Sequence, residues 1–242
     1  LQENSINRIF SDEHLLSILI KHEYEQLTHI DNDIDDIRNP KFTKEYYELL
    51  ENLYQKSLVN NLKYDDVSFE TKKSLFKVLY NKAPKKISEN LLNLKNDIKV
   101  IEDNYKSAEP EIVVIDNFLS NTALKEIQKF CRNANVFKYP YHGGYVGAFL
   151  SKGLSNPFIL QLNEDLRLTY NKIFNELRLT QAWIFKYDSQ KTGTNIHADQ
   201  ASVNVNFWIT PESGNLDKNS GGLKIWSKLP PSNWDFNAYN SL

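Results

Sequence analysis

The spacing of apolar residues changes along this chain, and this change constrains the fold more than any other feature of the sequence. Up to residue 107, apolar side chains recur every three or four positions, which is the spacing of one face of an α-helix. Over 183–187 and 203–209 they recur at every second position, which is typical of a strand with one buried face. Helices followed by consecutive strands predict an α+β fold, with a helical region at 1–107 and a mostly antiparallel sheet domain at 108–242.

Four helices are expected in the N-terminal region. Ser11, Thr43 and Ser68 can cap the first three, because a side-chain oxygen accepts a hydrogen bond from the free N–H groups of the first turn. The fourth is expected at 88–105, where the apolar residues form a one-sided stripe: Leu91, Leu94, Ile98, Ile101 and Tyr105. Such stripes indicate packing against a core or a partner. Helices of this length suit either a bundle or short repeats, and the region could dock another protein.

The second half of the chain predicts shorter elements. Strands are expected at 112–115, 183–187, 203–209 and 223–226, and helices at 122–132 and 158–177. The single cysteine, Cys131, falls in the first of these two helices among apolar residues. A buried structural thiol is therefore expected, and an intrachain disulfide is excluded.

Charge and hydropathy argue against two classes of partner. The formal net charge is −2 and the pI is about 6.3, so no net positive field attracts nucleic acid or anionic lipid. The longest apolar runs, such as Leu15–Ile20, are too short to span a bilayer. One cysteine and no visible signal peptide favour a reducing, cytoplasmic location. Because the sequence holds no methionine and stops in a turn-like stretch at Leu242, it is expected to be part of a longer polypeptide.

The segment His197-Ala198-Asp199 places an imidazole and a carboxylate two residues apart. In an extended chain, residues i and i+2 point to the same side, so both groups can face one cavity and hold one metal ion. One imidazole nitrogen and one carboxylate oxygen suit Fe(II), and a second histidine would complete the facial triad of non-haem iron oxygenases. The pattern is short and common by chance. Its weight comes from its setting between the strand ending at Tyr187 and the alternating strand at 203–209.

The order of motifs around this pair resembles that of the Fe(II)- and 2-oxoglutarate-dependent dioxygenases of the prolyl-hydroxylase type. Tyr187 comes ten residues before His197, and Gly221-Gly222-Leu223 follows the strand at 203–209. Residues 111–120 are similar to the strand and turn that open the domain of that family. The segments 142–148 and 204–211 look like a bacterial subgroup of it. The resemblance covers 109–242 and implies a double-stranded β-helix, the jelly-roll or cupin-like barrel.

The resemblance also implies a role for each matching residue. His197 and Asp199 would be the first two iron ligands, and the hydroxyl of Tyr187 would contact a carboxylate of 2-oxoglutarate. Asn206 and Trp208 share a strand face that could look into the same pocket.

The expected substrate contacts come from a glycine-rich loop that holds His142 and Tyr145 and could cover the mouth of the site. The implied reaction uses Fe(II) and 2-oxoglutarate to hydroxylate a C–H bond of a peptide or small molecule, with release of succinate and CO2. The remaining histidines, His14, His22 and His29, are expected to be solvated. His22 and His29 lie seven residues apart on a helix, about 10.5 Å in rise, which is too far for one metal ion.

The sequence also departs from the family pattern. The family needs a distal histidine and then a basic residue, usually arginine, that pairs with the far carboxylate of the cosubstrate. After Asp199 the sequence has no histidine and no arginine, only Lys218, Lys224 and Lys228. Either the missing strands and ligands lie beyond Leu242, or the protein is an inactive relative that acts as a metal-free binding module. A cupin-like isomerase is a third alternative, but such sites usually gather more histidines.

Overall fold

The fold is described from a computed structural model, which describes residues 9, 11–29, 44–78, 80–188, 194, 196–215, 222–228 and 231–241. The chain divides into two compact units, each built from three separate stretches. Unit 1 comprises Leu1–Lys85, Lys129–Ile159 and Thr180–Gly193, and unit 2 comprises Lys86–Gln128, Leu160–Leu179 and Thr194–Leu242. Helices occur together with an antiparallel sheet, which confirms the α+β class. The division predicted at residues 107 and 108 stays a prediction.

Helices α2 (Glu13–His29), α3 (Lys44–Leu58) and α4 (Phe69–Leu75) lie wholly in unit 1, with the 3-10 turn η2 (Tyr64–Asp66) before α4. Asp12 occupies the capping position predicted for Ser11, because its carboxylate accepts hydrogen bonds from the N–H groups of His14 and Leu15. Ser68 caps α4 as predicted and accepts from the N–H of Thr71. Thr43 lies outside the described residues.

The sheet of unit 1 has three antiparallel strands in the order β1 (Tyr139–Tyr141), β2 (Tyr145–Phe149) and β3 (Trp183–Tyr187). The hairpin between β1 and β2 turns at Gly144, whose φ of 77° is a conformation that glycine adopts without strain. The strand predicted at 183–187 is confirmed. Tyr145 was expected in a loop, but it pairs with Tyr187 and begins β2.

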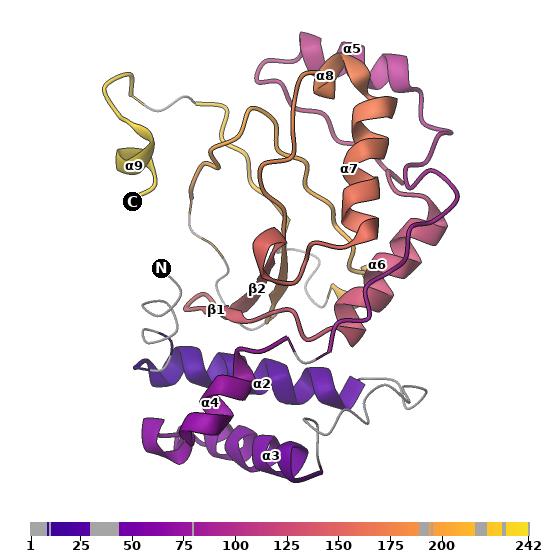
Figure 1. The fold of residues 1–242 in the computed structure, drawn as a ribbon. Coiled ribbons are helices and arrows are strands. Elements are labelled where there is room, and N and C mark those ends of the chain that lie inside the picture. Colours follow the sequence, from indigo (N-terminus) through magenta and orange to yellow (C-terminus); the bar gives the residue numbers. More distant parts are fainter. Residues whose placement is uncertain are drawn as a thin grey trace. The chain divides into compact units, whose positions relative to one another are not determined.

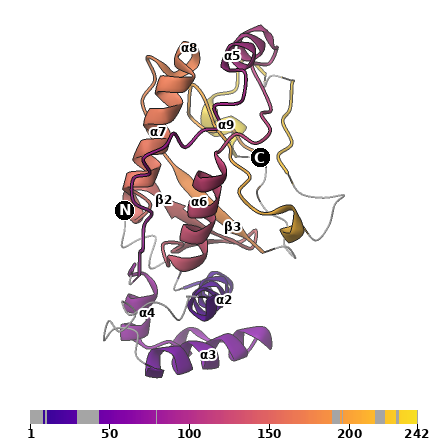
Figure 2. The same ribbon diagram turned by 90° about the vertical axis from the view of Figure 1, so that its right-hand side faces the viewer.

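Helix α2 is the centre of unit 1, because it contacts α3, α4 and the β1–β2 hairpin (Figure 1). Figure 2 shows α2 nearly end-on, with α3 beneath it. The apolar stripe of α2 packs with those of α3 and α4 in one core of buried side chains: Ile9, Leu15, Leu16, Leu19, Ile20, Leu50, Leu53, Leu62, Val67 and Leu75. The helical spacing of the sequence therefore marks the buried face correctly.

Unit 2 contains α5 (Ile98–Ser107), α8 (Asn171–Phe174), η4 (Glu212–Gly214) and α9 (Phe236–Tyr239). The divisions between the units fall inside α6 (Asn121–Asn133) and α7 (Pro157–Thr169), and η3 (Leu150–Lys152) belongs to unit 1. The helix predicted at 122–132 is confirmed by α6. The helix predicted at 158–177 is divided at Tyr170 into α7 and α8. Among the described residues, no helix is long and apolar enough to cross a membrane.

The helix predicted at 88–105 is wrong for its first half. Asp97 caps α5, so the helix begins at Ile98, and Leu92 forms a bridge with Leu119 instead. The reason is local, since the side chains of Asn90 and Asn93 accept hydrogen bonds from the backbone N–H groups two residues ahead. Such bonds compete with helical ones. The apolar spacing predicted from the sequence is present, but the side-chain hydrogen bonds of Asn90 and Asn93 keep this stretch of backbone from forming a helix.

Three predicted strands, 112–115, 203–209 and 223–226, form no strand or ladder, although all of their residues are described. Side chains alternate only over 206–209, where Phe207 and Ile209 are half-buried and Trp208 is exposed, while Val205 is exposed. A strand needs a partner for its backbone groups as well as an alternating pattern. The finer prediction, a double-stranded β-helix, therefore stays a prediction.

Candidate functional site

His197 and Asp199 approach each other in unit 2. The Nε2 atom of His197 lies 3.8 Å from Oδ1 of Asp199, and the two side chains are 48% and 32% exposed. Two ligand atoms that each lie about 2.1 Å from one first-row metal ion can be at most about 4.2 Å apart. The observed separation is below that limit, so one divalent ion can reach both atoms.

Neighbouring polar groups orient the carboxylate of Asp199. The amide nitrogen Nδ2 of Asn204 donates to its Oδ2 atom at 3.4 Å, while Oδ1 faces His197. The backbone C=O of Asp199 accepts from the N–H of Ala201 at 2.9 Å, which closes a tight turn after the pair. One carboxylate oxygen thus has a protein partner, and the other is directed to the imidazole.

The backbone between the two candidate ligands is held by Asn240. Its Oδ1 accepts from the N–H of Ala198 at 2.8 Å, and its Nδ2 donates to the C=O of Ala198 at 3.0 Å. Asn240 directly follows α9 and is the C-cap of that short helix. The sequence alone offered no sign of this contact, because the two residues are 42 positions apart.

A third metal ligand is not part of the described structure. Within the described ranges, no group of three or more histidine, cysteine, aspartate or glutamate side chains is placed to hold a metal ion. The predicted distal histidine and cosubstrate-binding arginine have no candidates after Asp199 in the sequence. The two alternatives drawn from this absence, ligands elsewhere in a longer polypeptide or a metal-free relative, both stay predictions.

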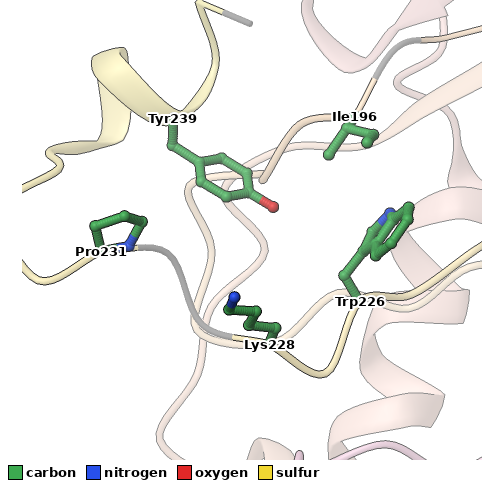
Figure 3. Close-up of a pocket in the computed structure, with 5 residues that line it drawn as sticks. All are labelled: Ile196, Trp226, Lys228, Pro231 and Tyr239. Carbon is green, nitrogen blue, oxygen red and sulfur yellow. The ribbon is translucent and has the colours of Figure 1, made fainter.

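A hollow of about 370 Å³ lies beside the pair, since Ile196 is one of its lining residues. Its other walls are Trp226, Lys228, Pro231 and Tyr239. Figure 3 shows the five side chains around a common space, with the hydroxyl of Tyr239 directed into it. The walls are mainly apolar, and Lys228 is the only charged residue among the five.

Asn206 and Trp208 are exposed on one side of the segment at 203–209, and Trp208 is 64% exposed. The other side of the segment packs within unit 2, where the ring of Phe207 lies 5.7 Å from that of Phe118. The C=O of Ile209 accepts from the side chain of Gln128. Neither Asn206 nor Trp208 lines the hollow, and their predicted part in cofactor binding stays a prediction.

The other predicted residues belong to unit 1. Tyr187 lies at the end of β3 with its ring 5.0 Å from that of Tyr145, which in turn stacks on Tyr141 at 4.6 Å. Burial raises the pKa of Tyr145 to about 12, with smaller contributions from Tyr187 and Tyr141. Its phenol therefore keeps its proton at neutral pH and can donate a hydrogen bond.

His142 lies in the turn of the hairpin. Its Nε2 atom is 3.2 Å from Oδ2 of Asp12, and its ring stacks on that of His14 at 5.7 Å. These contacts fix the imidazole at the surface of unit 1. Contact with a substrate stays a prediction for His142 and Tyr145.

The prediction that His22 is solvated is wrong. Its side chain is 4% exposed in the interior of unit 1, where its ring meets that of Phe137 edge-on at 5.4 Å. Its Nδ1 atom lies 3.2 Å from Nζ of Lys186, and its Nε2 atom has no hydrogen-bond partner among the described residues. Burial, followed by the charges of Lys186 and Lys138, holds the pKa of His22 well below its usual value.

This burial predicts acid sensitivity in unit 1. Below the usual histidine pKa of 6.5, the unfolded chain binds a proton at residue 22 that the folded chain does not bind. The free energy of unfolding should therefore fall with decreasing pH, by up to about 1.4 kcal/mol per pH unit from this group. The measurement is denaturant unfolding between pH 7 and pH 5.

A matched pair of variants isolates the effect. His22→Gln should reduce the pH dependence, because an amide does not titrate in this range. His29→Gln changes an exposed residue on the same helix and should keep the wild-type slope. Equal slopes in His22→Gln and the wild type would contradict the assignment to His22.

The thiol of Cys131 behaves as predicted from its apolar setting. Burial raises its pKa to about 12, so the group remains a thiol at neutral pH. It is therefore not an activated nucleophile at that pH.

Comparison with protein-family models, with curated proteins and with solved structures finds no match to this chain. A function for it therefore has to follow from its own residues and their geometry.

Proposed function

We propose that this protein is an Fe(II)- and 2-oxoglutarate-dependent oxygenase in which His197 and Asp199 are two of the three protein ligands of the metal. The observation that carries the proposal is the 3.8 Å approach of Nε2 of His197 to Oδ1 of Asp199. The order of motifs in the sequence supports it, from Tyr187 through the His-x-Asp segment to Gly222. Residues 108–242 would then be part of a double-stranded β-helix.

The two ligands have distinct tasks. The carboxylate of Asp199 offsets part of the charge of a divalent ion, and the imidazole of His197 binds as a neutral donor. Bound Fe(II) and 2-oxoglutarate supply the oxidising chemistry, in which O2 is used to release succinate and CO2 and to hydroxylate a C–H bond. Asn204 restricts the carboxylate, so that only Oδ1 is directed toward the imidazole.

The hollow lined by Ile196 supports an organic acid as the cosubstrate. Ile196, Trp226 and Pro231 offer apolar surface, and Lys228 offers a positive charge to a carboxylate. A peptide or a small molecule is the proposed substrate. On the sequence resemblance alone, Tyr187, Asn206 and Trp208 are proposed to contact the cosubstrate, and His142 and Tyr145 the substrate.

The direct test is succinate formation. Full-length protein, purified without oxygen, should convert 2-oxoglutarate to succinate when Fe(II) and air are supplied together. Zn(II) is the control, because it accepts similar ligands but has no redox chemistry. Folded protein that forms no succinate with Fe(II), or equal amounts with Zn(II), would rule out the oxygenase.

A metal-free binding module is the second candidate, and one observation favours it. Large apolar side chains of unit 2 are exposed, and such surfaces are typical of interaction sites: Trp208, Leu223, Ile225, Trp226 and Phe236. This alternative predicts that no divalent ion perturbs His197.

A further inference from the structure

The side chain of Asn240 occupies the place that a neighbouring strand would take in a sheet. It makes two hydrogen bonds to one residue, accepting from the N–H of Ala198 at 2.8 Å and donating to its C=O at 3.0 Å. A paired residue in an antiparallel ladder exchanges the same two bonds with its partner. Residues 197–199 belong to no ladder in the described structure. Asn240 therefore satisfies both backbone groups of the residue between the candidate ligands.

This contact determines more than the position of Ala198. The side chains of residues i and i+2 share a direction only while the backbone between them remains extended. Rotation of either peptide group at Ala198 would turn His197 away from Asp199 and would break at least one bond to Asn240. Two bonds at one residue thus restrict both rotations.

Asn240 is itself held by its own helical turn. Asp235 caps α9 and its carboxylate accepts from the N–H of Ala238 at 2.8 Å. The N–H of Asn240 donates to the C=O of Phe236, and the hydroxyl of Ser241 donates to that of Ala238. The turn also carries Tyr239, which lines the hollow. The amide of Asn240 is therefore presented from a capped turn and not from an unsupported chain.

We infer that Asn240 is a positioning residue, whose side chain holds the backbone of Ala198 so that His197 and Asp199 can bind one divalent ion. This inference rests on the proposed function, since it assigns Asn240 to the same metal pair. Asn240 contacts the backbone between the ligands and would not itself touch the metal. Residues that orient metal ligands commonly change metal affinity by about 10- to 100-fold when they are replaced.

The test compares Asn240→Ala with Asn237→Ala in the full-length protein. Asn237 lies on the same turn, and no side-chain hydrogen bond is described for it, so its replacement controls for a general effect on α9. Two measurements are made on each variant: hydrogen exchange at the N–H of Ala198, and titration with paramagnetic Co(II), followed by the NMR signals of the His197 ring.

In Asn240→Ala, exchange at Ala198 should accelerate by about tenfold or more, while amides of unit 1 keep their wild-type protection. The affinity for Co(II) should fall by about 10- to 100-fold, and Asn237→Ala should behave as the wild type in both measurements. If Asn240→Ala binds Co(II) as the wild type does, the inference is wrong and the proposed metal pair stands. If the wild type itself shows no Co(II) effect at His197, the proposed metal pair fails, and the role of Asn240 fails with it.

Discussion

Replacing His197 with alanine is expected to abolish divalent-ion binding by this chain and, with it, succinate formation from 2-oxoglutarate. The imidazole is one of only two candidate ligands described at the site, so its loss leaves Asp199 as a single carboxylate. Since replacement of a residue that merely orients a ligand costs about 10- to 100-fold in affinity, loss of the ligand itself should cost more than about 100-fold. The measurement is a Co(II) titration followed by the paramagnetic shift of the Asp199 amide signal.

The matched control is His29→Ala. This residue is an exposed histidine at the end of α2, and its replacement removes one imidazole from the chain without changing the proposed site. It should leave both Co(II) binding and turnover as in the wild type. Unchanged turnover in His197→Ala would rule out the assignment of His197. Equal losses in the two variants would mean that any imidazole of the chain contributes, and that the pair is not a site.

The sequence predicted that His197 and Asp199 point to the same side, because side chains at positions i and i+2 share a direction in an extended backbone. That part of the prediction uses local geometry alone. The contact of Asn240 with Ala198 could not be predicted in this way. It joins positions that are 42 residues apart through an amide whose residue type is common in turns.

The helices also differ in how well the sequence predicts them, depending on whether the apolar pattern alone determines where they begin and end. The helix at 122–132 was predictable, because its apolar stripe and its flanking turn agree. The start of α5 was misplaced because the side chains of Asn90 and Asn93 bond to the backbone, a choice that the apolar stripe does not reveal. The strands at 203–209 and 223–226 were expected from alternating apolar and polar residues. Such alternation indicates which side chains share a face, but it does not show that a second strand is available for pairing.

The polar interior of unit 1 was the largest omission of the sequence-based prediction. Helix α2 buries His22, Glu23 and Gln26 along with its apolar stripe. Their partners are more than 100 residues away: Gln26 donates to the C=O of Ala134, and Asn135 donates to Glu23. A polar residue beside an apolar stripe is usually solvated, so only the later part of the chain reveals why these three are buried.

Replacing Lys138 with methionine should lower the free energy of unfolding by about 3–5 kcal/mol, because it leaves a buried carboxylate without its cation. Nζ of Lys138 lies 2.7 Å from Oε2 of Glu23, and the two residues are 3% and 0% exposed. Asn135 donates to the other oxygen of Glu23 at 3.0 Å, and that single neutral donor cannot offset the charge. Denaturant unfolding measures the change.

Two further variants distinguish the effect of breaking the buried ion pair on the free energy of unfolding from the effect of removing any lysine. Lys63→Met breaks an exposed pair with Glu13, in which the lysine side chain is 62% exposed, and should change the free energy of unfolding by no more than about 1 kcal/mol. Glu23→Gln combined with Lys138→Met removes both charges and keeps an oxygen for Asn135, so it should recover much of the loss. If Lys138→Met costs no more than Lys63→Met, Glu23 is not held as a charged group inside unit 1. The polar cluster on α2 would then have to be stabilised by its hydrogen bonds alone.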